Sequence, residues 1–172
     1  MPISASIVKK KKNGIVDRPA KGRILTVAFW LWAAAVLILD RASKLIVARS
    51  LTPGNTLPLW RGRFHITYVR NPGGAFGFLP GGRGFFLLAS IIAIAAIIAY
   101  KNGRRSQSPL ADLALALILG GSIGNLVDRL LYGEVIDWLD FRFWPVFNIA
   151  DMALVIGLSL FAFEIIRSHK SV

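Results

Sequence analysis

The chain has 172 residues, a formal net charge of +12 and no cysteine. Its hydrophobic fraction of 55% and mean hydropathy of +0.57 are higher than in ordinary soluble domains. These values favour a single membrane domain and exclude disulfides, zinc–thiolate sites and thiol nucleophiles. Nucleic-acid binding is disfavoured, because the basic residues flank apolar runs and do not form a basic face on a folded module.

The N-terminal part combines a basic segment with the first apolar run. We expect residues 1–23 to form a cytoplasmic tail, followed by an apolar run at 24–39. A basic segment before an apolar run also fits a signal peptide. No clear small-x-small cleavage site follows this run, however, and we interpret it as an uncleaved membrane anchor. Further apolar runs at 85–100, 113–127 and 147–166 predict four transmembrane helices in all.

The uncharged cores of these runs are shorter than a membrane span and also fit buried helices of a soluble protein. Two features favour the membrane: each run reaches span length with its polar end residues, and basic clusters fall at alternate ends. The positive-inside rule then places both chain ends, including residues 169–172, in the cytoplasm. The expected fold is an all-α membrane protein, with a four-helix transmembrane domain over residues 24–168.

The outer segment at about residues 49–83 is too long for a simple turn. Residues 63–69 (RFHITYV) alternate in side-chain character, which predicts a short half-buried strand. Proline and glycine punctuate the rest of the segment as turns. We therefore predict a small β-containing platform that rests on the outer leaflet.

Polar residues gather at the predicted outer ends of the helices, whereas the cytoplasmic ends are mainly basic. The outer group consists of Asp40, Lys44, Asn71, Gly73, Asn125, Asp128, Arg129, Asp137, Asn148 and Asp151. Ionisable residues in or near a span are costly and mark functional sites. Their convergence on one membrane face predicts a site there.

Several of these residues have a structural interpretation beside a functional one. Asp40 and Lys44 are four residues apart and predict a helix-end ion pair. Asp128 is expected to brace the end of its helix, while Arg129 either braces it or binds a lipid phosphate or a substrate carbonyl. Asn71 lies either in a turn or against the substrate.

Two aspartates flank the last predicted hairpin, Asp137 in VIDW and Asp151 in FNIAD. Two close carboxylates share a proton, so that one accepts a proton from water while the other polarises an amide carbonyl. Alternatively, one or both acids cap helix ends. Asp140 remains open as a third candidate, because spacing alone does not exclude it.

Together the motifs resemble those of lipoprotein signal peptidase, the bacterial signal peptidase II family, over residues 24–166. GGSIGNLVDR and FNIAD fit the family pattern fully. VIDW stands where VIDF is commoner, RNPGGAF has Gly74 where alanine is usual, and DRASK has Arg41 where glutamine is usual. The basic segment before residue 24 has no counterpart in the family core.

The resemblance implies a monomeric four-helix aspartyl peptidase of the bacterial inner membrane, with its active site at the outer face. It acts without a metal or cofactor on diacylglyceryl-modified prolipoproteins, among membrane lipids, and cuts before the lipidated cysteine. Asp137 and Asp151 match the family's catalytic dyad, and Asp128 and Asp140 do not. The expected substrate-binding residues are Asn71, Gly73, Asn125, Arg129 and Asn148, and the expected structural ones are Asp40, Lys44 and Asp128.

Two other classes compete with this interpretation. An ion- or proton-coupled transporter places ionisable groups near the membrane midplane, commonly on broken helices within internal repeats. The chain shows no repeat, and its second apolar run carries no charge. A non-enzymatic membrane scaffold has no need for both Asp137 and Asp151. Loss of cleavage on substitution of either acid distinguishes the peptidase from both alternatives.

Overall fold

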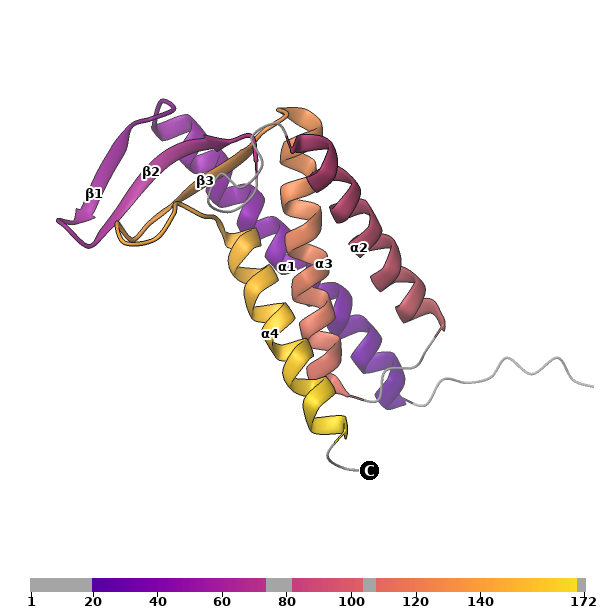
Figure 1. Cartoon of the computed structure of the whole chain (residues 1–172). Helices are drawn as coiled ribbons and strands as arrows, with labels where there is room; N and C mark the ends of the chain where they lie inside the picture. The colour runs from indigo at the N-terminus through magenta and orange to yellow at the C-terminus, as the bar shows by residue number, and fades with distance from the viewer. Residues whose placement is uncertain (1–19, 74–81, 104–107, 170–172) are drawn as a thin grey trace, which may run out of the picture.

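A computed structural model describes residues 20–73, 82–103 and 108–169, which form a helical bundle with a small sheet at one end (Figure 1). The described helices are α1 (Ala20–Ser50), α2 (Arg83–Gly103), α3 (Pro109–Leu131) and α4 (Ile149–His169). Each predicted apolar run lies mainly within a helix, but the helices extend beyond the runs. The basic tail up to residue 19, the last three residues and Gly74 lie outside the described residues.

Three helices of the described chain are long and apolar enough to cross a membrane: residues 83–102 of α2, and all of α3 and α4. The first helix is not among these three, and the side chains of its first six residues, 20–25, are not among those described. Four transmembrane helices therefore stay a prediction, whereas a mostly helical membrane fold with a small sheet is what the structure contains.

The sheet has the order β1-β2-β3, with β1 at Thr56–Trp60, β2 at Phe64–Asn71 and β3 at Val135–Asp140. The strand predicted at 63–69 is confirmed as β2. The third strand was not predicted, and it joins the platform from a part of the sequence between α3 and α4. Both strand pairs are antiparallel, and a register shift in β2 between Ile66 and Val69 sets Val69 opposite Asp137.

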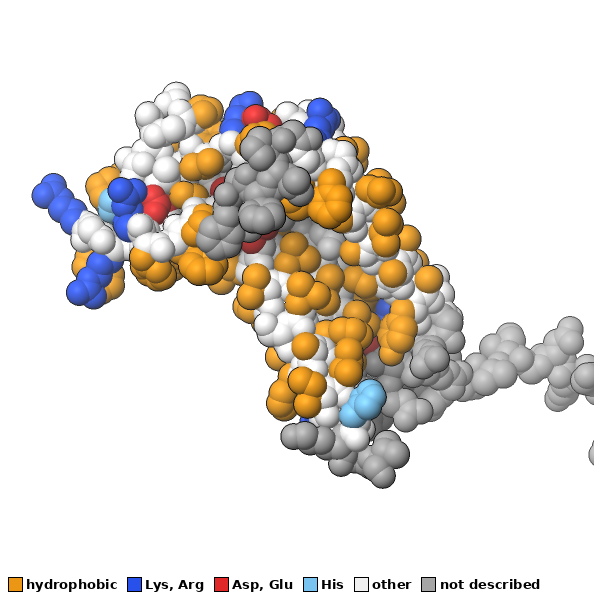
Figure 2. All heavy atoms as spheres, viewed as in Figure 1, with side chains coloured by type: hydrophobic (Ala, Val, Ile, Leu, Met, Phe, Trp, Pro, Cys, Tyr) orange, Lys and Arg blue, Asp and Glu red, His pale blue; other side chains and the backbone are white. Residues whose placement is uncertain are grey.

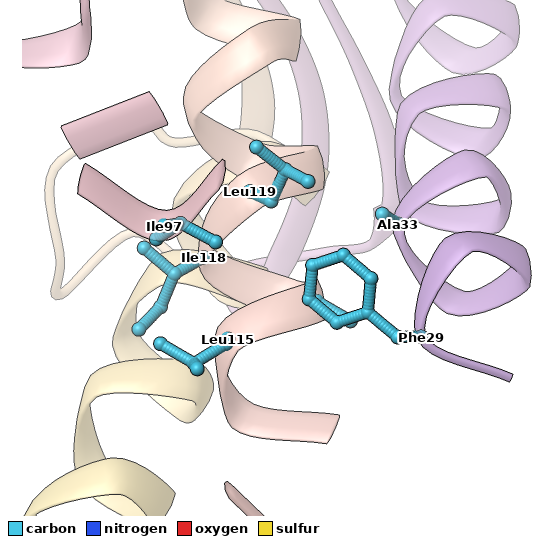
Figure 3. Packing of buried hydrophobic residues seen from close by; sticks show 7 residues of the cluster. Phe29, Ala33, Ile97, Leu115, Ile118 and Leu119 are labelled. Atoms are coloured by element: carbon cyan, nitrogen blue, oxygen red, sulfur yellow. The ribbon is translucent and has the colours of Figure 1, made fainter. Parts of the chain in front are cut away.

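Helix α3 is the centre of the bundle. In its most apolar stretch 67% of the residues are buried, against 6% in the corresponding stretch of α2 and 17% in that of α4. A buried cluster joins α1, α2 and α3 through Phe29, Ala33, Ile97, Leu115 and Leu119, among others (Figure 3). The outward faces of α2 and α4 are apolar and exposed (Figure 2). Such faces suit lipid as the surrounding solvent.

Glycines on α3 allow its neighbours to approach closely. A Cβ atom at Gly121 would lie 2.5 Å from the backbone oxygen of Ala150 on α4, and one at Gly124 would lie 2.6 Å from Asp40 Oδ2. Small residues at such contacts are typical of helix packing in membranes. The glycines therefore position α1 and α4 against α3.

We expect Gly121→Ala to destabilise the protein by about 1–3 kcal/mol, the usual cost of overpacking, because a rigid backbone carbonyl blocks the added methyl group. Gly84→Ala on α2 is the matched control, since nothing lies within 4 Å of the position that its added Cβ would take. Thermal unfolding of the two purified variants in the same detergent measures the difference. Equal unfolding temperatures would contradict the assigned packing.

Candidate active site

The N-terminus of α4 is capped by a reciprocal pair of hydrogen bonds between Asn148 and Asp151. The backbone N–H of Asp151 donates to Asn148 Oδ1 at 2.8 Å, and the backbone N–H of Asn148 donates to Asp151 Oδ2 at 3.3 Å. This is a capping box, and it fixes both side chains in the first turn of the helix. A carboxylate there is also favoured by the partial positive charge of the helix N-terminus.

Asp137 lies on β3 with only 2% of its surface exposed, and it is held by two side-chain amides. Asn148 Nδ2 donates to Asp137 Oδ1 at 2.6 Å, and Asn71 Nδ2 donates to Asp137 Oδ2 at 2.9 Å. Asn71 reaches it because Val69 is the strand partner of Asp137, and Asn71 lies two residues further along the same face of β2. The N–H of Gly73 donates to Asn71 Oδ1 at 3.0 Å and orients that amide.

Asn125 on α3 connects the second aspartate to the same network. Its Nδ2 donates to Asp151 Oδ1 at 2.8 Å. Its Oδ1 accepts hydrogen bonds from Asn148 Nδ2 at 3.1 Å and from Lys44 Nζ at 3.0 Å. Three amides from β2, α3 and the α4 cap thus hold the two carboxyl groups, Asp137 and Asp151, in one hydrogen-bonded cluster.

The ionisation of Asp137 is strongly perturbed. Burial raises the pKa of Asp137 to about 7, and the negative charge of nearby Asp151 contributes to the same increase. The hydrogen bonds from Asn71 and Asn148 act in the opposite direction and are outweighed. Asp137 therefore binds a proton near neutral pH while it lies beside a second carboxyl group. Such a pair is suited to general acid–base chemistry.

Arg129 lies beside the hydrogen-bonded cluster of Asp137 and Asp151 and lines the same cavity. Its guanidinium lies over the ring of Phe86 at 5.1 Å and donates to the backbone oxygen of Asn125 at 3.4 Å. Arg83 Nη2 in turn donates to the backbone oxygen of Arg129 at 3.1 Å. No sequence pattern indicated this contribution from Arg83 and Phe86, because neither belongs to a recognisable motif.

A cavity of about 580 Å³ opens beside the two aspartates. Its polar end is lined by Asn71, Gly73, Arg129, Asp137 and Asp151. Its apolar end follows the loop before α4 and the first turns of that helix, with Trp144, Pro145, Val146, Phe147, Met152, Leu154, Val155 and Ile156. A ligand with a polar reactive group and a long apolar part matches such a cavity.

Next to the amide network lies a second cluster, which contains only buried charges and their partners. Lys44 Nζ is 2.8 Å from both Asp40 Oδ2 and Asp128 Oδ2, and all three side chains are fully buried. Asp40 Oδ1 also accepts the backbone N–H of Ala150 at 3.0 Å. The ion pair predicted between Asp40 and Lys44 is therefore present, and it connects α1 to both α3 and α4. Its predicted position at the end of the helix is wrong, because α1 continues to Ser50.

Asp128 has further partners that tie the cluster to the sheet. Its carboxylate accepts a hydrogen bond from the guanidinium of Arg41 and another, at 3.2 Å, from the backbone N–H of Ile136 on β3. The two acids and two bases balance in charge. Arg41, at the position where the family pattern usually has glutamine, supplies the positive charge beside that of Lys44.

Asp140 lies on β3 away from the cavity. Its Oδ2 accepts from Thr67 Oγ1 at 2.6 Å and from Arg142 Nη1 at 3.0 Å. Burial raises the pKa of Asp140, but the hydrogen bonds from Thr67 and Arg142 outweigh burial, so that the pKa lies below its usual value. The structure thus separates Asp140 from the other two candidate acids. No group of three or more His, Asp or Glu side chains among residues 20–73, 82–103 and 108–169 is arranged to hold a metal ion.

Comparison with known proteins gives a family for this arrangement. A model of the family described as signal peptidase (SPase) II matches residues 32–167. The chain belongs to the signal peptidase II family. It is accordingly a peptidase of the membrane, and its role belongs to lipoprotein maturation.

Relatives and solved structures agree with this assignment. A lipoprotein signal peptidase of Pelotomaculum thermopropionicum is 43% identical over 80% of this chain and 91% of its own length. One of Syntrophomonas wolfei is 46% identical over 75% of this chain and 86% of its own length. A solved bacterial membrane enzyme is 31% identical, covers 84% of this chain and 91% of its own, and superposes with a TM-score of 0.79.

We expect Asp128→Asn to reduce the free energy of unfolding by roughly 3–5 kcal/mol, because it leaves buried cations without a full counter-charge. The pair of Glu164 with the exposed Arg167 is the control, and Glu164→Gln should cost less than Asp128→Asn, because Glu164 pairs with one cation and Asp128 with two. Thermal unfolding and the yield of folded protein report the effect. A fully stable Asp128→Asn that lacks activity would instead assign Asp128 to the chemistry.

Proposed function

We propose that the protein is an aspartyl endopeptidase that removes signal peptides from diacylglyceryl-modified prolipoproteins by cutting before the lipidated cysteine. The observation that carries this proposal is the shared amide network around Asp137 and Asp151 at the polar end of the cavity. Family membership supports the substrate class, since the relatives bear the name lipoprotein signal peptidase.

The chemistry follows from the different protonation of the two acids. Asp137, with its pKa raised to about 7, holds the shared proton and polarises the scissile carbonyl. Asp151, as the ionised member, takes a proton from water, and the oxygen of that water attacks the carbonyl carbon. The tetrahedral intermediate then collapses: the C–N bond breaks, and a carboxyl group of the pair donates its proton to the leaving nitrogen.

The amides and Arg129 keep this pair in order. Asn148 and Asn71 each donate to one oxygen of Asp137, so its protonation and orientation are coupled to the cap of α4 and to β2. Arg129 lines the cavity beside both acids and presents a cation to carbonyl oxygens of the bound peptide. Gly73 is suited to close approach by a substrate backbone, because it has no side chain.

The apolar end of the cavity fits the lipid of the substrate. It follows the side of α4 on which Val155 and Ile156 are exposed, so acyl chains reach it sideways from the bilayer. The basic clusters of the sequence place the chain ends in the cytoplasm and the sheet outside, with four spans in all. In that orientation the dyad faces precursors at the outer leaflet of the inner membrane.

Asp137→Asn and Asp151→Asn should each reduce cleavage of a lipidated prolipoprotein roughly 10⁴-fold or more, because an amide neither accepts nor donates the required proton. The double variant should be little worse than either single one, since the two acids act as a unit. Rates are measured with purified protein and a synthetic lipopeptide.

Asp140→Asn is the matched control, because Asp140 is on the same strand as Asp137 but does not line the cavity. It should retain most of the activity. Substantial cleavage by Asp137→Asn or Asp151→Asn would remove the aspartyl mechanism and return the choice to a transporter or a scaffold.

The rate should also depend on pH in a defined direction. Because the pKa of Asp137 is raised to about 7, the proton is present below that pH and is lost above it, so cleavage should fall as pH rises through about 7. It should fall again in acid when the ionised partner takes up a proton. A rate that stays flat between about pH 6 and 9 would contradict a protonated member of the pair.

Lipid on the substrate should contribute much of its affinity, at roughly 0.8 kcal/mol per buried methylene. A precursor peptide with an unmodified cysteine should therefore be cut far more slowly than its diacylglyceryl counterpart, mainly through a higher KM. The two peptides are compared at matched detergent concentration. Equal kcat/KM values would exclude recognition of the lipid.

A further inference from the structure

A second hollow lies at the end of the sheet that carries the β1–β2 turn, and neither Asp137 nor Asp151 lines it. It is a shallow groove of about 560 Å³ between the β1–β2 turn and the loop that follows β3. Its lining consists of Trp60, Gly62, Arg63, Phe64, Phe141, Arg142 and Phe143. None of these residues lines the cavity beside the aspartates, so the groove is a separate site.

The floor of the groove is aromatic and exposed at the protein surface. The rings of Phe64 and Phe141 are 4.9 Å apart, and that of Phe143 follows 6.2 Å from Phe141. Phe143 is 84% exposed and Trp60 is 61% exposed. Figure 2 shows apolar side chains on the lower side of this end of the sheet, the side toward the apolar helices. Aromatic side chains in such a position are typical of the membrane–water interface.

Two guanidinium groups border this floor, and each is held in place. The Arg63 guanidinium lies over the ring of Trp60 at 4.8 Å. Arg142 has a φ of 67°, and its backbone N–H and its guanidinium both donate to Asp140, at 2.9 and 3.0 Å. A positive φ is uncommon for a residue with a side chain, so this turn is maintained by its contacts. Asp140 balances one of the two cations, and among the described residues no carboxylate lines the groove.

We propose that this groove binds an anionic phospholipid of the surrounding leaflet. The phosphate lies between Arg63 and Arg142, whose planar forks match its oxygens, and the glycerol and upper acyl carbons lie on Phe141 and Phe143. A free phosphate would use the arginines but not the aromatic floor, and a neutral diacylglycerol would use only the floor. The groove offers both, as a phospholipid requires.

Such a lipid would also brace the active-site cavity. The rings of Phe141 and Phe147 stack 5.9 Å apart, and Phe147 lines the cavity beside the dyad. One loop, residues 141–147, therefore forms a wall of both sites. A lipid in the groove would therefore contact the same loop that lines the cavity.

The test is a lipid titration of the purified full chain in detergent, followed by native mass spectrometry. The probes are phosphatidylglycerol, diacylglycerol with the same chains, and glycerol phosphate. Wild type should bind phosphatidylglycerol in a saturable manner and at least ~10-fold more tightly than either other probe, because charged hydrogen bonds contribute about that factor. If diacylglycerol bound as tightly as phosphatidylglycerol, recognition of the phosphate would be excluded. If glycerol phosphate bound as tightly, recognition of the acyl chains would be excluded.

Variants make the assignment specific to the groove. Arg63→Gln with Arg142→Asn should weaken phosphatidylglycerol ~10-fold or more, with asparagine chosen because it tolerates positive φ. Arg61→Gln is the control, since Arg61 is exposed on the same turn but does not line the groove. Unchanged binding in the double variant, or an equal loss in the control, would overturn the proposal. If the double variant fails to fold, Arg63→Gln alone decides, because this side chain lies on the surface of the exposed Trp60 ring.

Discussion

The structure depends on the burial of one positive charge, that of Lys44. A fully buried ammonium is tolerated only where its desolvation is offset by nearby charges and hydrogen bonds. Asp40, Asp128 and Asn125 provide them. Since these partners lie on α1 and α3, and Asp40 also binds the N-terminus of α4, a single ion orders the bundle at the end that carries the sheet.

One amide side chain, that of Asn125, connects this charge to the proposed catalytic pair. Asn125 accepts from Lys44 with its oxygen and donates to Asp151 with its nitrogen, which fixes the direction of its amide. Asp128 meanwhile holds the backbone of Ile136, the residue before Asp137 on β3. Both aspartates are thus positioned by the same buried ions. The buried ions and the proposed dyad therefore form one connected polar region at the end of the bundle that carries the sheet.

The apolar surface of the bundle has a complementary role. Apolar side chains that would be unfavourable in water cover α2 and α4 (Figure 2). Val155 and Ile156, which line the cavity beside the proposed dyad, are exposed on α4. The proposed active site is therefore continuous with the region that lipid occupies. A peptidase whose substrate carries acyl chains has a reason to leave that side open, whereas a soluble peptidase would close it.

The sequence alone predicted the helices, the strand β2 and the polar residues around the two aspartates, because hydrophobic runs, alternation and short motifs are local signals. It did not predict the apolar lining of the cavity. It did not reveal that Val135–Asp140 is a strand, since a short segment forms β-structure only when β2 offers a partner edge. Nor did spacing alone distinguish Asp137 from Asp140. The structure gives them different surroundings, because Asp137 bonds to Asn71 and lines the cavity whereas Asp140 bonds to Thr67 and does not line it. Long-range contacts of this kind, including the link from Arg41 to Asp128, exist only once the helices have packed.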